Sequence, residues 1–286
     1  MEATTSLPER ILKGLNEIPP LPNVVIKLMK LIRDPETTAK QLTDLISQDQ
    51  ALTSNILRLC NSSYYGMPRV VSSLSQAIMY LGFHTVRNLV ITCSLRQLFN
   101  PEQEVYGYKA GGIWFHAVCC AITSQMICKK VHPDVSDSSF TGGLLHDIGQ
   151  LVMAITIKDT AETIIELMNN GVPELEAEKV AVGISHDHLG AILANNWNFP
   201  DDLVFAIRYH HVPNQSKRKS ILTSIVHLAD TIVLDLGYGI EMEQMKYPPQ
   251  DFAMNLAKVD EDMMKSFRDE AEELIESHAE HFMVKV

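Results

Sequence analysis

The stretch GGLLHDIG, residues 142–149, places a histidine–aspartate pair inside an apolar segment that glycines flank on both sides. Burying an imidazole beside a carboxylate costs several kcal/mol unless the charge is paired or bound to an ion. We therefore expect other parts of the chain to supply partners for His146 and Asp147. The pair alone is weak evidence, because the sequence contains a second one, His186-Asp187.

The composition of the 286-residue chain is that of an ordinary globular protein, with 46% hydrophobic residues, enough for one large domain or two small ones. Its formal net charge of −11 argues against a broad contact with nucleic acid, which requires clustered Lys and Arg. We therefore set aside a DNA-binding regulator and expect no nucleic-acid partner. A small basic pocket remains compatible with this charge.

The cysteines and the start of the chain indicate a cytoplasmic protein. The five cysteines are odd in number, form no C-x-x-C pair and are typical of small buried hydrophobes in a reducing compartment. Residues 1–10 lack the basic start and apolar core of a secretion signal, and no apolar run approaches the roughly 18 residues of a membrane helix. We expect no membrane partner.

Apolar residues recur at helical spacing along nearly the whole chain, and no convincing strand alternation occurs. The sequence therefore predicts an all-α fold, with Thr38 and Asp49 as helix caps. The final segment has an acidic outer face, which a solvated helix surface explains. The expected helices span 24–32, 39–46, 50–60, 75–81, 85–98, 112–130, 139–157, 161–169, 174–184, 188–197, 201–210, 221–236 and a closing segment from about 260.

Ligand-type residues in apolar surroundings occur at further places in the sequence: His116, His186, His210-His211 and Asp230. Taken singly, each is more often a hydrogen-bonded core or solvated residue than a metal ligand. Taken with the pair at 146–147, they form a nitrogen-rich set that suits transition metals rather than Mg²⁺ or Ca²⁺.

Seven such ligands exceed the needs of one tetrahedral site. Two metals about 3.5 to 4 Å apart could share Asp147 as a bridge, generate hydroxide and hold a phosphoryl group. We expect two divalent transition metals, Fe or Mn in the first place, with Ni, Co or Zn as alternatives.

The order of these residues, in GLLHDIGQL, GISHDHLG, AIRYHHVP and VHLADTI, resembles the HD superfamily of metal-dependent phosphohydrolases. In ligand type it is similar to the binuclear HD-GYP branch. The resemblance implies a multi-helix bundle with two metals. One would be held by His116, His146, Asp147 and Asp230, and the other by Asp147, His186, His210 and His211.

Residues 11–210 resemble an HDOD domain, the HD-related output domain of bacterial signalling proteins. The marks are the proline-rich entry at 18–22, the 49–61 helix ending in Asn-Ser, the 77–82 helix and the GLLHDIG core. The resemblance implies an N-terminal helical subdomain at about 11–105 and a metal-binding core from about 110, with a junction near 106–112. Residues 211–286 would add helices that complete the core and an acidic terminal helix.

The sequence departs from the HD-GYP pattern at several positions. Gly112 stands where those enzymes carry a ligand glutamate, Gln150 where HD enzymes often carry lysine, and VPNQS follows the histidine pair instead of Gly-Tyr-Pro. We therefore do not expect cyclic-di-GMP hydrolysis. Arg208 or Lys158 could contact phosphate instead, although an exposed helix arginine is the simpler interpretation of Arg208. His227 lies one turn before Asp230 and is either a supporting contact or a core residue.

Two functions fit these residues. The first is a bacterial signal-transduction HDOD module with a retained binuclear metal site, which acts through a separate signalling protein or a small phosphorylated ligand. The alternative is a metal-dependent phosphohydrolase acting on a nucleotide or other phosphoester, with Asp147 as its catalytic metal bridge. The scarcity of basic residues near the expected metals favours the module.

Overall fold

The computed structural model describes residues 11, 23–32, 36–96, 106–109, 111–156, 160–278 and 281, and throughout these ranges the chain is helical without a regular strand. The predicted all-α class is thus confirmed. One isolated antiparallel bridge joins Tyr108 to Ile240. Of the helices described, none is both long and apolar enough to cross a lipid bilayer. The proline-rich entry at 18–22 lies outside the described residues.

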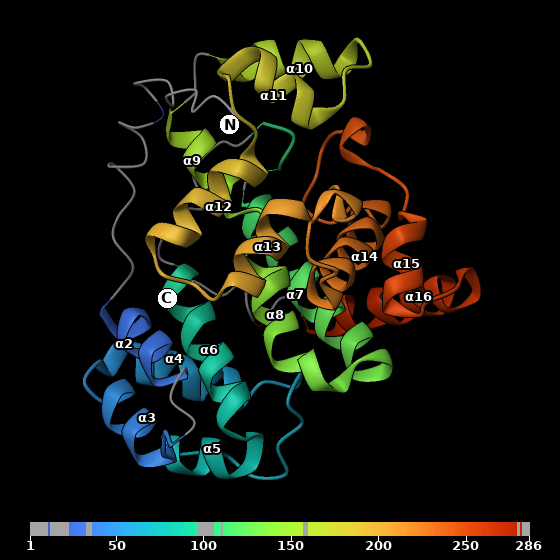
Figure 1. Ribbon diagram of the computed structural model, residues 1–286. Coiled ribbons are helices and arrows are strands. Elements are labelled where there is room, and N and C mark those ends of the chain that lie inside the picture. The colour runs from blue at the N-terminus through green and yellow to red at the C-terminus, as the bar shows by residue number, and fades with distance from the viewer. Residues whose placement is uncertain are drawn as a thin grey trace.

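The N-terminal helices form a group of short elements on one side of the molecule (Figure 1). Both predicted caps are present: the Thr38 side chain accepts a hydrogen bond from the Gln41 amide, and Asp49 Oδ1 accepts one from the Leu52 amide at 2.9 Å. Such caps satisfy amides that the first helical turn leaves unpaired. The helices are α2 (Asn23–Ile32), α3 (Ala39–Ile46), α4 (Gln50–Cys60), α5 (Leu74–Leu81) and α6 (Phe83–Arg96).

The centre of the molecule is built on two helices that are apolar on nearly all sides, α7 (Gly112–Val131) and α14 (Ile221–Asp235). A helix that is apolar all round is typical of a buried position. Helix α7 packs against α8 (Ser136–Leu145) and α14, and α6 also contacts α8. Figure 1 shows α7 and α8 between the N-terminal helices and the C-terminal ones.

The remaining helices surround this centre. Helix α12 packs against α9 and α13, and α14 contacts α15 and α16. Helices α10 and α11 form a pair at one end of the molecule (Figure 1). Their bounds are α9 (Ile148–Thr156), α10 (Ala161–Asn169), α11 (Glu174–Val182), α12 (His186–Asn196), α13 (Asp201–Tyr209), α15 (Asp251–Ala257) and α16 (Glu261–His278), with short 3-10 turns at Pro133–Val135, Pro213–Gln215 and Glu243–Met245.

The single helix predicted for 139–157 is wrong, because the chain breaks at the His-Asp pair. Helix α8 ends at Leu145 and α9 begins at Ile148. His146 Nδ1 lies 2.7 Å from the Gly143 carbonyl oxygen, so the imidazole folds back on the end of α8. Apolar periodicity continues through the break, and therefore the sequence pattern does not reveal it.

Other elements also differ from the sequence-based prediction. Helix α12 begins at His186, two residues earlier than expected, which places this histidine in the first helical turn. Helix α15 was not predicted and follows the Pro248-Pro249 segment. The predicted junction packs against the C-terminal part: the Lys109 amide donates to the Gly239 carbonyl at 3.0 Å.

Glycines allow very close approaches of backbone around the His-Asp pair. A Cβ atom on Gly149 would lie 1.9 Å from the His186 carbonyl oxygen, and one on Gly143 would lie 2.5 Å from the Cys120 carbonyl oxygen. A Cβ on Gly142 would instead meet only side chains, at 3.1 Å or more. The first two glycines therefore set how closely α9 approaches α12 and α8 approaches α7.

We expect Gly149→Ala to separate α9 from α12 and to lower the free energy of unfolding by ~3 kcal/mol, at the upper end of typical overpacking costs. The matched variant Gly142→Ala should cost less, because the Val226 and Leu222 side chains can move. Urea denaturation followed by circular dichroism measures both. Equal stability of the two variants would contradict this account.

Candidate metal centre

The structure brings together the side chains of all seven residues predicted as metal ligands, and five parts of the chain supply them. Helix α7 carries His116, the break between α8 and α9 carries the His-Asp pair, and α12 begins with His186. The histidine pair follows directly after α13, and Asp230 comes from α14. Their ligand atoms form two buried groups, one of His116, His146 and Asp230 together with Cys120, and one of Asp147, His186, His210 and His211.

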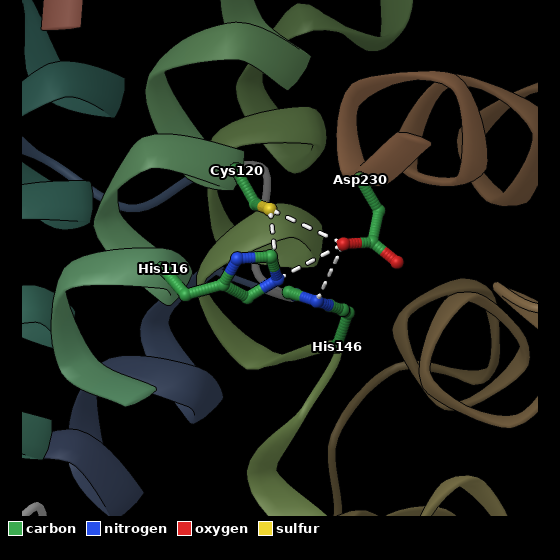
Figure 2. A group of neighbouring side chains, drawn as sticks. All are labelled: His116, Cys120, His146 and Asp230. Carbon is green, nitrogen blue, oxygen red and sulfur yellow. Dashed lines mark hydrogen bonds and ion pairs between the residues drawn. The ribbon is translucent and has the colours of Figure 1, made fainter. Parts of the chain in front are cut away.

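In the first group the side chains point toward one another from α7, the helix break and α14 (Figure 2). Asp230 Oδ1 lies 2.9 Å from His116 Nε2 and 3.5 Å from His146 Nε2. Cys120 Sγ is 3.5 Å from His116 Nε2 and 3.6 Å from Asp230 Oδ1. The four residues are almost completely buried.

In the second group two imidazoles face one carboxylate oxygen, and a third lies beside them. His186 Nε2 and His210 Nε2 each lie 3.4 Å from Asp147 Oδ1. His211 Nε2 lies 3.0 Å from His186 Nε2. Nitrogen ligands outnumber oxygen ligands here, as transition metals favour.

Asp147 lies between the two groups, and each of its oxygens faces a different one. Oδ2 lies 3.3 Å from His146 Nε2 and 3.8 Å from His116 Nε2. Oδ1 faces His186 and His210 of the second group. This is the arrangement that a carboxylate bridging two metals requires.

The imidazoles are held by hydrogen bonds from their outer nitrogens. Nδ1 of His116, His146 and His210 faces the carbonyl oxygens of Tyr238, Gly143 and Ile207 at 3.2, 2.7 and 2.8 Å. Because a carbonyl only accepts, each Nδ1 must donate, and in a neutral ring the lone pair of Nε2 then points inward.

Two of these inward-facing Nε2 atoms lack a hydrogen-bond partner, which shows whether a metal ion would suit the residues around them. Nε2 of His146 and of His210 is buried and has no hydrogen-bond partner in the described part of the chain. A buried polar atom without a partner costs about 1–3 kcal/mol, and a divalent cation would satisfy both nitrogens. The donor set therefore fits transition-metal ions.

The pKa shifts of the buried residues show that the carboxylates of the centre favour positive charge beside them. Burial alone would raise the pKa values of Asp147 and Asp230, yet the facing histidines hold both well below the ordinary value. Burial would lower the pKa of His146, but these two carboxylates raise it well above 6.5. Protons on the imidazoles and metal ions thus compete for the same carboxylates.

The structure also shows supporting residues that the sequence analysis missed. The Tyr108 hydroxyl donates to Asp147 Oδ2, and the Tyr247 hydroxyl donates to Asp230 Oδ2. Glu178 Oε1 accepts from His186 Nδ1 at 2.7 Å, and its Oε2 accepts from the His186 amide at 2.8 Å. These contacts fix the ligands as outer partners commonly do in metal sites.

Some of these residues had a signal in the sequence. Cys120 follows His116 by four residues, which puts both on one face of α7. Glu174 and Glu178 are likewise one turn apart on α11, and both are buried. Nothing in the local sequence distinguishes Tyr108 or Tyr247 from the other tyrosines.

The positions that depart from the HD-GYP pattern have structural roles of their own. A Cβ on Gly112 would lie 2.1 Å from the Gly239 carbonyl oxygen, so no side chain fits there. Gln150 is buried and its Nε2 donates to Glu174 Oε1 at 3.2 Å. Arg208 donates to buried Asp187 and lines a different pocket from the metal-ligand residues. Its contact with phosphate stays a prediction, and Lys158 lies outside the described residues.

The fold and the centre define an all-helical protein built around a buried cluster of histidines and aspartates. A sequence model of the HDOD domain family matches residues 18–213. The chain belongs to the HDOD domain family. This match covers the five N-terminal helices and the histidines of the centre, but not Asp230 on α14.

Solved structures and a curated relative are also similar to this chain. An HDOD domain protein of unknown function from Geobacter sulfurreducens is 23% identical, with a TM-score of 0.80 over 96% of this chain and 99% of that chain. A candidate phosphohydrolase from Shewanella amazonensis is 25% identical, with a TM-score of 0.76 and 96% and 97% coverage. An uncharacterized protein of Treponema pallidum is 25% identical over 85% of this chain, which spans about half of it (47%).

His227 supports the centre from behind. Its Nδ1 donates to the His210 carbonyl oxygen at 2.6 Å, and its Nε2 accepts from the Gln250 amide at 2.9 Å. The ring therefore joins the histidine pair to the segment before α15 and must stay neutral to make both bonds. Burial lowers its pKa to about 4.

We expect this histidine to make the protein less stable in acid. The folded pKa of His227 is below the value of 6.5 for an unfolded histidine, so its contribution is complete above pH 6.5 and is lost as the pH falls through about 4. The shift corresponds to at most ~3 kcal/mol. His227→Gln should flatten this pH dependence in chemical denaturation with a chelator present, whereas His132→Gln, at a partly exposed site, should not.

Proposed function

We propose that this chain is a signal-transduction module whose helices are organised around a two-metal centre. The proposal of a metal centre rests on the position of Asp147, whose two oxygens each face a different group of histidines. The inward, partnerless Nε2 atoms of His146 and His210 support it. The metals would be divalent transition metals, with Fe or Mn expected first.

The closed surroundings of the centre favour a module over an enzyme. The cavity between the ligand residues has a volume of about 10 Å³, far below the roughly 300 Å³ at which small-molecule pockets begin. The hydroxyl groups of Tyr108 and Tyr247 donate hydrogen bonds to Oδ2 of Asp147 and of Asp230, respectively. Arg208, which the sequence offered as a possible phosphate contact, is paired with Asp187.

A metal-dependent phosphohydrolase is the second candidate, and the bridging position of Asp147 favours it. Bound metals would supply a nucleophilic hydroxide and stabilise negative charge on a phosphoester. Asp147 would then hold both metals, while the histidines fix their positions. The similarity to the candidate phosphohydrolase from Shewanella amazonensis is consistent with this chemistry.

As a module, the chain would act through another protein. Its N-terminal helices contact the metal-bearing part through α6 and α8, so a change at the centre could reach them through α8. The partner we propose is a signalling protein, with a small phosphorylated ligand as the alternative. The family assignment supports an output role of this kind.

The two His-Asp pairs provide a matched test of the metal centre. After loading with Fe²⁺ or Mn²⁺, the wild-type chain should contain two metals by elemental analysis. Asp147→Asn should contain one or fewer, because the bridging charge is lost. Asp187→Asn, at the second pair, should retain two. A wild-type protein without bound metal would overturn the proposal.

An activity assay separates the two candidate functions. We expect wild-type protein with a verified content of two metals to hydrolyse none of a panel of cyclic nucleotides, linear nucleotides and aryl phosphates. The reason is that the cavity is small and the nearest arginine is already paired. Turnover that disappears in Asp147→Ala would establish the phosphohydrolase instead.

A further inference from the structure

Cys120 belongs to the first ligand group, although a cysteine at an apolar position would usually be taken for a core residue. Its side chain is fully buried, and its sulfur points toward His116 and Asp230 (Figure 2). The polar atoms that it reaches are His116 Nε2 at 3.5 Å and Asp230 Oδ1 at 3.6 Å. The sulfur therefore lies beside a nitrogen and an oxygen that the first ligand group already brings together.

The distances from the Cys120 sulfur to its two neighbours match those of a tetrahedral metal site. A zinc ion takes sulfur at about 2.3 Å and nitrogen or oxygen at about 2.0–2.2 Å. At tetrahedral angles these bond lengths require a sulfur to lie roughly 3.5–3.6 Å from each neighbouring nitrogen or oxygen ligand. The two measured sulfur distances, 3.5 and 3.6 Å, agree with this requirement.

A second, independent observation points to an ion at the same place. His146 Nε2 faces the same point, is completely buried and has no hydrogen-bond partner within the described chain. It lies 3.5 Å from Asp230 Oδ1, which is again a distance between two ligands of one metal. Cys120 is thus the fourth corner of a group whose other corners are two imidazoles and a carboxylate.

We propose that the Cys120 sulfur is a metal ligand and completes a site of two nitrogens, one oxygen and one sulfur with His116, His146 and Asp230. This inference rests on the proposed two-metal centre. On binding, the thiol proton leaves to water and the thiolate forms the bond to the metal. The other group, with three imidazoles and Asp147, has no sulfur.

The difference between the two groups gives them different metal preferences. A thiolate is a soft ligand that selects zinc or ferrous iron over manganese. The site with Cys120 should therefore hold a thiophilic ion. The all-nitrogen-and-oxygen site should accept manganese as well. The centre is then hetero-selective, with Asp147 lying between two unlike metals.

Cobalt spectroscopy tests this proposal on the full-length protein. Chelator-treated protein is reloaded with Co²⁺, and we expect two ions per chain together with a thiolate-to-cobalt charge-transfer band in the near ultraviolet. Cys120→Ser should lose the band. Its zinc affinity should fall by more than the roughly 10- to 100-fold that loss of an outer partner costs. Cys119→Ser, the adjacent and equally buried cysteine, should keep both.

X-ray absorption of the zinc-loaded wild-type protein makes the test independent of folding of the variants. A sulfur neighbour at about 2.3 Å from zinc would support the proposal. Two bound metals with only nitrogen and oxygen neighbours and no charge-transfer band would overturn the role of Cys120 but leave the two-metal centre standing. Failure to bind any metal would overturn the centre itself.

Discussion

The carboxylate of Asp147 is the contact on which the arrangement of the core depends. Its two oxygens face separate groups of histidines, which come from α7, α12, the end of α13 and the chain break after α8. Such sharing needs the His-Asp pair to point both side chains into one volume. Neighbouring residues of a continuous helix diverge by about 100°, so α8 has to end at Leu145.

Close backbone contacts make this convergence geometrically attainable. Gly143 lets α8 approach α7, and Gly149 lets α9 approach the first turn of α12, where His186 begins. The glycines that flank the pair in the sequence are therefore part of the site. They set the distance between helices, and the ligands take their positions from that distance.

Much of the centre could be predicted from residue type and order. Histidines and aspartates in apolar segments are rare enough that seven of them indicate a common site. The structure brings all seven together. The break at 146–147 could not be predicted, since apolar periodicity continues across it. Cys120 was missed because a cysteine among apolar residues is usually a core residue, and only its distances to His116 and Asp230 set it apart.

The outer supports were also invisible in the sequence, for a different reason. Tyr108 and Tyr247 reach Asp147 and Asp230 from other segments of the chain, and their roles follow only from tertiary contacts. A single tyrosine carries no spacing that relates it to a distant aspartate. Sequence reasoning can therefore find the ligands more readily than the residues that orient them.

The use of charge within the molecule supports the regulatory role that we propose for this centre. Arg208 is paired with Asp187, and Gln150 donates to Glu174, so neither is directed at a substrate. The binding energy of metals would then go mainly into holding helices together. A ligand at 100 times its Kd stabilises a fold by about 2.7 kcal/mol, which is large beside the 5–15 kcal/mol of a typical domain. Metal occupancy would thus change how firmly α8, and through it α6, is held, which is the property that a signalling module needs.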